Sequence, residues 1–366
     1  MVEAGSAIRH SDHDAPVVVF ANPFSGHRDN RARVAGLEAA LAARRVPCRV
    51  VWSPTEWGGA LAGPVRALVA AGGDGSVNAA VNALGRSSRP DTPFATLPVG
   101  TENLFAAALG FDRPVADLAD ALSRAADAGG TRPLDVGEVS RPPMCGSGTR
   151  AAAADPPHRF VLMLSRGFDA AVVARMDAWR RAAANPGAAP AVSPNPAAPG
   201  GLRRVNRWSY APRIAATLLR YGHPAVRLVT DAGESVTGAR AYVFNLDRYG
   251  GGFPLGAGAA GDDGQMDWLV FRRPGRLRTL RDHWLAARHR HRDADHVAWG
   301  RASSLRLEAV DRPVPTQADG DPLPGSLDRA DGLSLRVRPG ALRVVDTGPA
   351  TDPAAGSKAA RPVSAS

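Results

Sequence analysis

The chain has 366 residues, 44% of them hydrophobic and 22% charged, with a formal net charge of +10. That length allows two domains, each with its own core, and the composition is that of a globular protein rather than a disordered or fibrous one. Lys358 is the only lysine, which excludes a Walker-type phosphate loop ending in Gly-Lys-Ser/Thr, and a lysine Schiff base, from the folded part.

Residues 16–140 alternate strand and helix signals, which predicts an α/β domain whose parallel sheet is covered by helices on both faces. The residues Val34, Leu37, Glu38 and Leu41 carry a helical period. Ligands of such sheets bind at the carboxyl ends of the strands. The predicted strands are 17–20, 48–52, 65–71 and 94–97, and further helices are predicted at 77–84, 104–109 and 116–126.

After residue 141 the pattern changes to many short strands, which predicts a β-sandwich domain over 158–345. Pro-, Gly- and Ala-rich stretches at 142–157 and 183–201 are typical of flexible insertions. Residues 346–366 have no apolar period and are predicted to be a disordered tail. The predicted strands are 160–164, 225–230, 239–246, 266–271, 304–309, 333–337 and 342–345, and two helices interrupt them at 207–221 and 276–291.

A glycine turn, Gly72-Gly73-Asp74-Gly75-Ser76, lies between a predicted buried strand and a helix. Glycines let the backbone approach an anion closely, and the start of a helix directs free N–H groups at it. Ser76 can cap the helix, and Asp74 can hold a metal that rides on phosphates. The turn therefore predicts a polyphosphate cradle.

Three further segments accompany this turn. Asn22-Pro23-Phe24-Ser25-Gly26 follows the first strand, and Gly100-Thr101-Glu102-Asn103 lies where the fourth strand becomes a helix. Gln317-Ala318-Asp319-Gly320-Asp321 supplies two carboxylates that can divide general-base and metal duties, although an Asp-Gly hairpin turn explains it as well. Taken in order, these segments predict a ligand held between two strand ends and a downstream acidic pair.

The ordered segments resemble the diacylglycerol kinase-like lipid kinases, a family that includes bacterial lipid kinases, sphingosine kinases and ceramide kinases, over about 17–345. The family's glycine-aspartate signature matches 72–76 with Ser for Thr, and its Pro-x-Gly-Thr-x-Asn segment matches 98–103. Its second-domain phrases match Gly167-Phe168-Asp169-Ala170 and Asp263-Gly264-Gln265-Met266-Asp267. The resemblance implies a Rossmann-like domain of the NAD kinase/diacylglycerol kinase type followed by a β-sandwich.

This resemblance implies a kinase that uses ATP and Mg²⁺ to phosphorylate the hydroxyl of a lipid such as diacylglycerol, in phospholipid biosynthesis. Asp321, helped by Asp319, takes the role of catalytic base. Asp74 is the expected ligand of the nucleotide's metal, and Asp263 and Asp267 are expected to hold a second, structural metal, although a hairpin turn explains the last two nearly as well. The nucleotide contacts implied are Asn22, Ser25, Gly26, Thr55, Gly72, Gly73, Asp74, Gly75, Ser76, Asn78, Gly100, Thr101 and Asn103, with Ser53 as an alternative to Thr55 and with Arg28 and Arg31 as charge partners.

Two positions depart from the family pattern. Leu104 stands where bacterial members usually carry an aspartate, and Asp321 stands where the family has its catalytic glutamate. The shorter side chain reduces the reach of this carboxylate by about 1.5 Å. Because proton transfer depends steeply on position, the change predicts reduced activity.

The basic segment 276–291 carries an apolar stripe of Leu277, Leu280, Trp284 and Leu285 surrounded by arginines (Arg276, Arg278, Arg281, Arg288 and Arg290). Such a stripe either packs on its own domain or lies on a membrane surface. The chain lacks a nucleic-acid reader motif, so no nucleic acid partner is expected. The expected partner is a lipid at a membrane surface, and a homodimer stays open.

The chain has two cysteines, Cys48 and Cys145, without paired spacing, which fits a reducing cytoplasm. Residues 1–15 lack the apolar core of a signal peptide, and no apolar stretch reaches the roughly 18 residues of a spanning helix. The expectation is a soluble protein that contacts at most the inner face of a membrane. Two alternatives remain: a soluble kinase of the NAD kinase type, which shares the Gly-Gly-Asp-Gly turn, and a non-catalytic lipid-binding relative.

Overall fold

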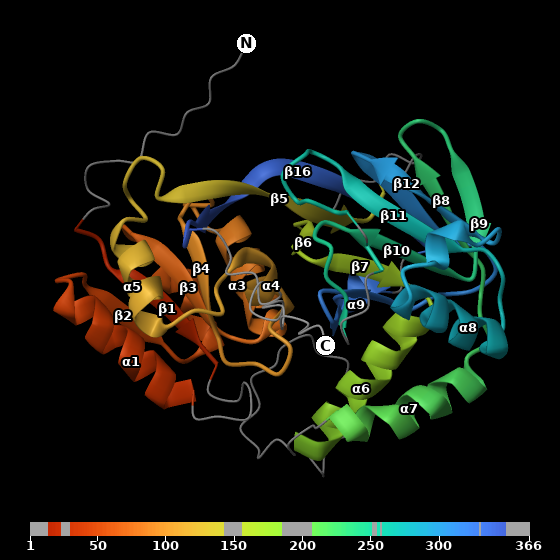
Figure 1. Ribbon diagram of the computed structural model, residues 1–366, viewed down its shortest axis with the longest axis horizontal. Helices are drawn as coiled ribbons and strands as arrows, with labels where there is room; N and C mark the ends of the chain where they lie inside the picture. The colour runs from red at the N-terminus through yellow and green to blue at the C-terminus, as the bar shows by residue number, and fades with distance from the viewer. Residues whose placement is uncertain are drawn as a thin grey trace, which may run out of the picture.

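The computed structural model describes residues 14–22, 30–142, 156–184, 207–250, 255–256, 258–328 and 331–348. Within these ranges the strands form two sheets, one of ten strands and one of six. No helix among the described residues is long and apolar enough to cross a bilayer. Figure 1 shows the chain as two halves joined by a long ribbon of strands.

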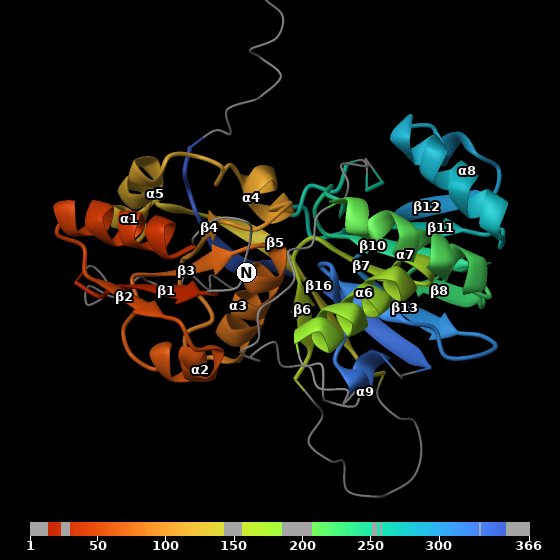
Figure 2. The same cartoon turned by 90° about the horizontal axis from the view of Figure 1, so that it is seen from below.

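The first half is built on four parallel strands in the order β2-β1-β3-β4. The first and third strands of the chain are continuous apolar runs with every residue buried, as parallel strands covered on both faces require. Figure 2 shows α1 and α5 on one face and α2 and α3 on the other, which confirms the predicted α/β sheet. The bounds are β1 Val17–Ala21, α1 Asn30–Ala43, β2 Cys48–Val51, η2 Pro54–Glu56, α2 Trp57–Ala60, β3 Ala67–Gly72, α3 Asp74–Arg86, β4 Phe94–Pro98, α4 Leu104–Leu109 and α5 Val115–Ser123.

The two halves share one sheet through the last strand of the chain. The sequence predicts two strands at 333–337 and 342–345, but both belong to a single strand, β16 (Gly332–Val345), with an irregularity between Arg338 and Leu342. One end of β16 pairs with β13 of the second half, and its other end pairs in parallel with β4. It also pairs along most of its length with β5 (Thr131–Ser140), a strand that the sequence reading missed. The chain therefore ends by tying its second half to its first.

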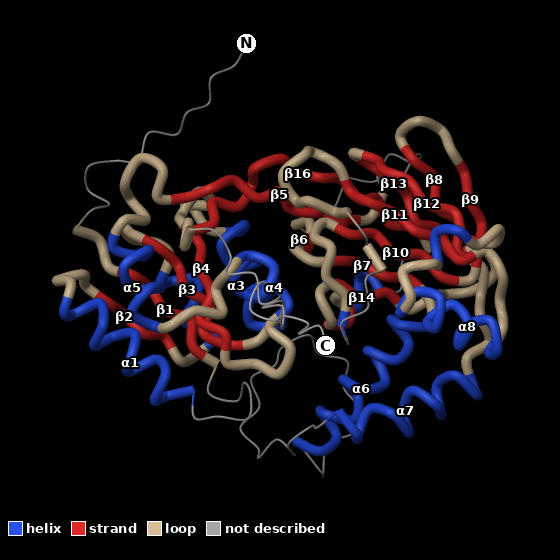
Figure 3. Tube along the Cα trace, viewed as in Figure 1, coloured by secondary structure: helices blue, strands red, loops and turns tan. Residues whose placement is uncertain are grey.

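The second half is a sandwich in which a six-stranded sheet, order β12-β11-β10-β7-β14-β15, faces the outer part of the long sheet. A core that includes Leu228, Trp268 and Leu335 fills the space between them. Figure 3 shows the helices α6, α7 and α8 on one side of these strands. The bounds are β6 His158–Phe160, β7 Met163–Arg166, α6 Phe168–Ala184, α7 Arg207–Arg220, β8 Val226–Thr230, β9 Ser235–Gly238, β10 Arg240–Phe244, β11 Met266–Phe271, α8 Arg276–Ala287, η4 His291–Asp293, β12 Val297–Ala302, β13 Ser304–Ala309, β14 Thr316–Ala318, β15 Asp321–Pro322 and α9 Gly325–Asp328.

The predicted strand at 160–164 is wrong, because the structure divides it between β6 in one sheet and β7 in the other. At the break, the backbone N–H groups of Val161 and Leu162 donate to the carboxylate of Asp319 instead of to a neighbouring strand. The sequence pattern also did not predict the helix that follows, α6. Its alternation of small and charged residues has little amphipathic period.

Several predictions fall on residues that the structure does not describe. The Asn-Pro turn is described only at Asn22, so Ser25, Gly26 and Arg28 lie outside the described residues, as does Cys145. The same holds for most of the predicted insertions, 142–157 and 183–201, and for the tail after 348.

Candidate active site at the carboxyl edge of the parallel sheet

The predicted nucleotide residues of the first half follow the carboxyl ends of four neighbouring strands. Thr55 follows β2, Asn22 follows β1, Gly73 follows β3 and Gly100 follows β4, and these strands lie in that order in the sheet. Because parallel strands end at one edge, the sheet brings together residues that are far apart in the sequence. The hydroxyl groups of Ser53 and Thr55 lie 2.7 Å apart at the β2 end of this edge.

The two glycine turns touch each other through their backbones. A Cβ placed on Gly100 would lie 2.4 Å from the Cα of Gly73, and one on Gly73 would lie 3.2 Å from the Cα of Gly100. Position 100 therefore needs glycine, and a side chain at position 73 would push the other turn away by a few tenths of an ångström. The turns that end β3 and β4 therefore form one surface at the start of α3.

Asp74 joins the same two turns through its side chain. Its two carboxylate oxygens accept hydrogen bonds from the backbone N–H groups of Leu104 (3.1 Å) and Phe105 (3.0 Å), the first residues of α4. Burial raises the pKa of Asp74, and the two amide donors oppose that rise. Leu104, where the family usually has an aspartate, takes part through its backbone and not its side chain.

Asn103 holds the backbone of the second glycine turn, and Asn22 contacts a side chain of the first. The Asn103 side chain accepts from the Gly100 N–H at 2.8 Å and donates to the Gly100 carbonyl at 2.9 Å, while its own backbone adopts the left-handed conformation with φ 53°. Asn22 Nδ2 lies 3.5 Å from the Ser76 hydroxyl. Thr101 and Glu102 are exposed. The side chain of Asn103 is thus committed to the shape of the turn, and Thr101 is free to face solvent or a ligand.

One face of α3 is polar and contacts the second half of the molecule. Asn78 and Asn82, one helical turn apart and both buried, each donate to the carbonyl of Arg159 in β6, at 3.1 and 2.9 Å. Asn82 also accepts from the Arg159 N–H at 2.8 Å. The sequence reading placed Asn78 at the nucleotide; the structure places its side chain against β6 and Asp319.

Asp319 is a buried anchor between the two halves. Its carboxylate accepts from the N–H groups of Val161, Leu162 and Met163 at 2.8–2.9 Å, and from Asn78 Nδ2 at 2.8 Å. Burial raises the pKa of Asp319 to about 6, although these donors lower it. With four donors in place, the geometry suits Asp319 for positioning. Its share in proton transfer remains a prediction.

Asp321, two residues further on, lies against the glycine turn. A Cβ placed on Gly75 would lie 2.8 Å from Asp321 Oδ2, so the carboxylate rests on the first turn of α3. Burial raises the pKa of Asp321 to about 6, nearby Arg180 and Arg181 lower it, and Asp177 and Asp74 raise it. The sandwich thereby brings a carboxylate to the cradle, 247 residues from Asp74 in sequence but close enough for the Asp74 charge to raise the pKa of Asp321.

Of the two arginines that the sequence suggested as charge partners, the structure describes Arg31, whose role at the nucleotide stays a prediction. Arg31 lies over the ring of Trp52, with its guanidinium carbon 5.0 Å from the ring centroid. Arg33, which the sequence reading missed, donates to the carbonyl of Pro98 at 2.6 Å. Among the charged groups near Asp321, Arg180 in α6 lowers the pKa of its carboxyl group most. The sequence offered no signal for Arg180, because α6 itself was not predicted.

The acidic pair Asp263 and Asp267 is neutralised by arginines. Arg301 forms an ion pair with Asp263, and its Nε lies 3.8 Å from Asp267. Arg292 lies 3.8 Å from the other oxygen of Asp267. Within the described residues, no three His, Cys, Asp or Glu side chains are grouped to hold a metal ion. The pair as arranged does not fit a divalent cation, because guanidinium groups take its place.

Asp74 is different in this respect. Magnesium in phosphoryl-transfer sites is held by one or two carboxylates together with phosphate oxygens and water, and not by a full protein cage. The Asp74 carboxylate accepts from backbone N–H groups, those of Leu104 and Phe105 among them, and the roughly four lone-pair sites of a carboxylate leave acceptor capacity for a cation. Asp74, with Asp321 nearby, therefore fits such an ion.

Family models and curated relatives agree with this geometry. Residues 16–139 match the model of the diacylglycerol kinase catalytic domain, and residues 195–346 match that of the YegS C-terminal NAD kinase beta sandwich-like domain. A probable lipid kinase YegS-like protein of Pseudomonas aeruginosa PAO1 is 37% identical over 134 residues, 35% of this chain and 41% of that protein. A diacylglycerol kinase of Bacillus subtilis is 41% identical over 76 residues, 20% of this chain and 23% of that protein. These alignments span less than half of the length of either relative.

Solved structures share the fold at low identity. A diacylglycerol kinase structure from Bacillus anthracis has a TM-score of 0.58 at 16% identity and covers 93% of this chain and 97% of its own. Yeast NADH kinase in complex with NADH has a TM-score of 0.52 at 10% identity, covering 96% and 91%. These likenesses show the fold. The two domain models, which match in the expected order, and the curated relatives show that the chain belongs to the diacylglycerol kinase-like lipid kinase family.

Proposed function

We propose that this protein is an ATP-dependent lipid kinase that transfers the γ-phosphoryl group to the hydroxyl of a lipid such as diacylglycerol. The contact between Asp321 and Gly75 carries this proposal, because it puts a carboxylate directly on the start of the helix that would receive the phosphates. Phosphoryl transfer needs positioning and neutralised charge more than covalent help from the protein. The family relatives support the kinase class.

Asp321 is the group that accepts the proton in this proposal. A general base works best when its pKa lies near the working pH, and burial raises the pKa of Asp321 to about 6. The lipid hydroxyl loses its proton to the Asp321 carboxylate as its oxygen forms a bond to the γ-phosphorus, while the bond from that phosphorus to the β,γ-bridging oxygen breaks and ADP leaves. Asp319 keeps the loop that carries Asp321 in place through its four donors.

The phosphates would lie on the glycine turns, where backbone N–H groups at the start of α3 are directed at the edge of the sheet. Bound Mg²⁺ would supply positive charge to the phosphate oxygens, and Asp74 is the residue suited to hold it. Arg180 in α6 is the proposed protein cation at the same place, because the described part of the chain has no lysine.

The test is transfer of label from γ-labelled ATP to a panel of lipids, with NAD as a second acceptor, using the full chain. Transfer to a lipid hydroxyl, lost by at least a hundredfold in Asp321→Asn, supports the proposal. The variant Asp117→Asn, an exposed carboxylate on α5, is the matched control and keeps wild-type activity.

Other outcomes contradict the proposal. Transfer to NAD alone identifies a nucleotide kinase with the same glycine turn. Lipid binding without any transfer identifies a non-catalytic relative.

The variant Asp321→Glu restores the family's side chain at this position. A rise in its activity shows that the reach of the Asp321 carboxylate limits the wild type.

A further inference from the structure

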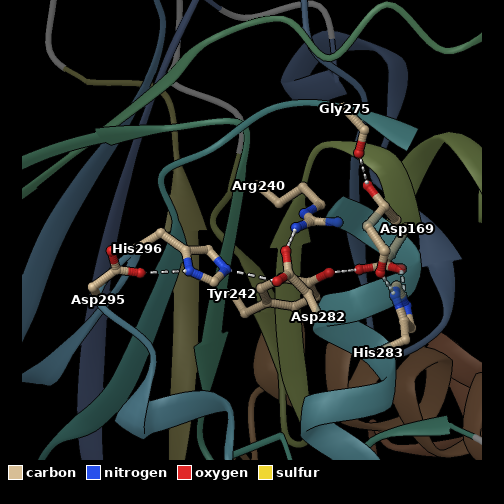
Figure 4. Close-up of polar contacts among 9 residues, drawn as sticks. Asp169, Arg240, Tyr242, Gly275, Asp282, His283, Asp295 and His296 are labelled. Carbon is tan, nitrogen blue, oxygen red and sulfur yellow. Dashed lines mark hydrogen bonds and ion pairs between the residues drawn. The ribbon is translucent and has the colours of Figure 1, made fainter. Parts of the chain in front are cut away.

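The helix α8 is held firmly on its inner face. Asp282 forms a buried ion pair with Arg240, and its other oxygen lies 2.7 Å from His296 Nε2 (Figure 4). The next residue, His283, lies 3.7 Å from Asp169, which also accepts a hydrogen bond from Tyr242. These buried polar contacts fix the rotation of the helix about its axis, so the side chains on its outer face are presented in one orientation.

The outer face of α8 is apolar and uncovered in this structure. Leu277, Leu280 and Trp284 are 82%, 55% and 51% exposed. The sequence left open whether this stripe packs on its own domain; in the structure only Leu285 does so. Among the described residues, seven large hydrophobic side chains are exposed, and five of them lie on α7 and α8: Ile214, Leu219, Leu277, Leu280 and Trp284. The concentration of these side chains on two neighbouring helices distinguishes this surface from scattered exposed residues.

The same surface is strongly basic. A groove of about 770 Å³ lies between the end of α7 and the start of α8, and Arg276, Arg278 and Arg281 line it. Tyr221 and His223 also line it, and their hydroxyl oxygen and ring nitrogens are buried without hydrogen-bond partners. The described lining residues include no acidic side chain. An anion in the groove would face three guanidinium groups and the uncapped start of the helix, where a negative charge is favoured.

We propose that the outer face of α8 and this groove form a docking surface for a membrane that contains anionic lipids. The leucines and Trp284 enter the boundary between headgroups and acyl chains, and the arginines bind lipid phosphates in the groove. Charge favours a membrane over a second copy of the chain, because a symmetric contact through this face would oppose arginines to arginines. The docking goes beyond the proposed kinase activity and does not depend on ATP.

The test is co-sedimentation of the full chain with vesicles of phosphatidylcholine alone and of phosphatidylcholine with phosphatidylglycerol. Binding is expected only to the anionic vesicles and to weaken with salt. The double variant Arg276→Gln, Arg281→Gln is expected to bind roughly 30-fold more weakly, at about 1 kcal/mol for each arginine at the surface. The variant Leu277→Ser, Trp284→Ser is expected to lose at least tenfold in affinity even at low salt.

The matched controls change similar residues elsewhere on the surface. Trp299→Ser removes a side chain that is 49% exposed, and Arg227→Gln removes one that is 47% exposed. Both are expected to bind anionic vesicles as the wild type does. Because the altered side chains on α8 are exposed, the variants are expected to fold. Thermal melting at the wild-type temperature would confirm this.

Several results would overturn the proposal. The first is equal binding of the wild type to both kinds of vesicle, and the second is wild-type binding by the α8 variants. The third is self-association of the wild type that the variant Leu277→Ser, Trp284→Ser abolishes. Preference for an oligonucleotide over anionic vesicles has the same consequence. Transfer to a lipid dispersed in detergent is expected to be unaffected by the α8 substitutions, so a failure of docking and a failure of the kinase proposal are separable.

Discussion

The carboxylate of Asp321 rests on the Cα of Gly75, at the start of α3. A Cβ at Gly75 would lie 2.8 Å from Asp321 Oδ2, closer than real side chains approach. The glycine of the family signature is thus explained here by the Asp321 carboxylate that packs against it as well as by the phosphates expected on the turn. This contact can be tested without disturbing the fold.

The substitution Gly75→Ala should lower activity without lowering stability. Alanine is about 1 kcal/mol more favourable than glycine inside a helix, so thermal melting should stay or rise. The added methyl group displaces Asp321, and the rate of lipid phosphorylation should fall at least tenfold. The control Gly58→Ala, where a Cβ meets nothing within 4 Å, should change neither quantity. Wild-type activity in Gly75→Ala would show that the position of Asp321 does not matter for transfer.

Activity should depend on pH through Asp321. The base works only when deprotonated, and burial raises its pKa to about 6. The value of kcat/KM should therefore fall about tenfold for each pH unit below 6 and level off above it. A profile measured with saturating ATP, after a check that the protein stays folded at each pH, tests this. An unchanged rate down to pH 5 would argue against Asp321 as the base.

Asp74 should stabilise the fold in the absence of any ligand. In Asp74→Asn only one oxygen remains to accept from Leu104 and Phe105, and the new amide group faces the other N–H. The expected loss is about 1–3 kcal/mol in the free energy of unfolding, measured by urea denaturation without nucleotide or metal. Asp117→Asn is the control. If Asp74→Asn were as stable as the wild type, the two hydrogen bonds would not stabilise the fold, and Asp74 would act only in ligand binding.

Asn78 and Asp319 should be energetically coupled across the two halves. The single variants Asn78→Ala and Asp319→Ala each leave buried groups without a partner, and Asp319→Ala should cost more because three backbone N–H groups are involved. A double-mutant cycle in urea should give a coupling of about 1–3 kcal/mol. The pair Asn78 and Asp117, which share no contact in the described structure, should give none.

Removal of divalent cations should not destabilise the sandwich. The guanidinium groups of Arg301 and Arg292 already neutralise Asp263 and Asp267. Thermal melting of the protein in EDTA should match that in excess Mg²⁺ when no nucleotide is present. A large rise with Mg²⁺ that Asp263→Asn abolishes would instead indicate a metal at this pair.

The local pattern of the sequence was sufficient for much of the first half. The apolar runs 17–20 and 94–97 form buried strands as their composition predicts, and the glycine turns after them mark the edge where parallel strands end. The order of the four segments was enough to indicate the family. These features are local, or depend only on the order of residues along the chain.

The tertiary structure decided what the acidic side chains do. Asp74, Asp319 and Asp321 are of one residue type, yet Asp74 bonds to the start of α4, Asp319 to four donors from two halves, and Asp321 only rests on Gly75. The division of 160–164, the single strand at the end of the chain and the exposure of Leu277 likewise depend on partners distant in sequence. The hydrogen bonds and the burial of a side chain depend on which distant groups the fold brings next to it. A pattern along the chain does not contain that information.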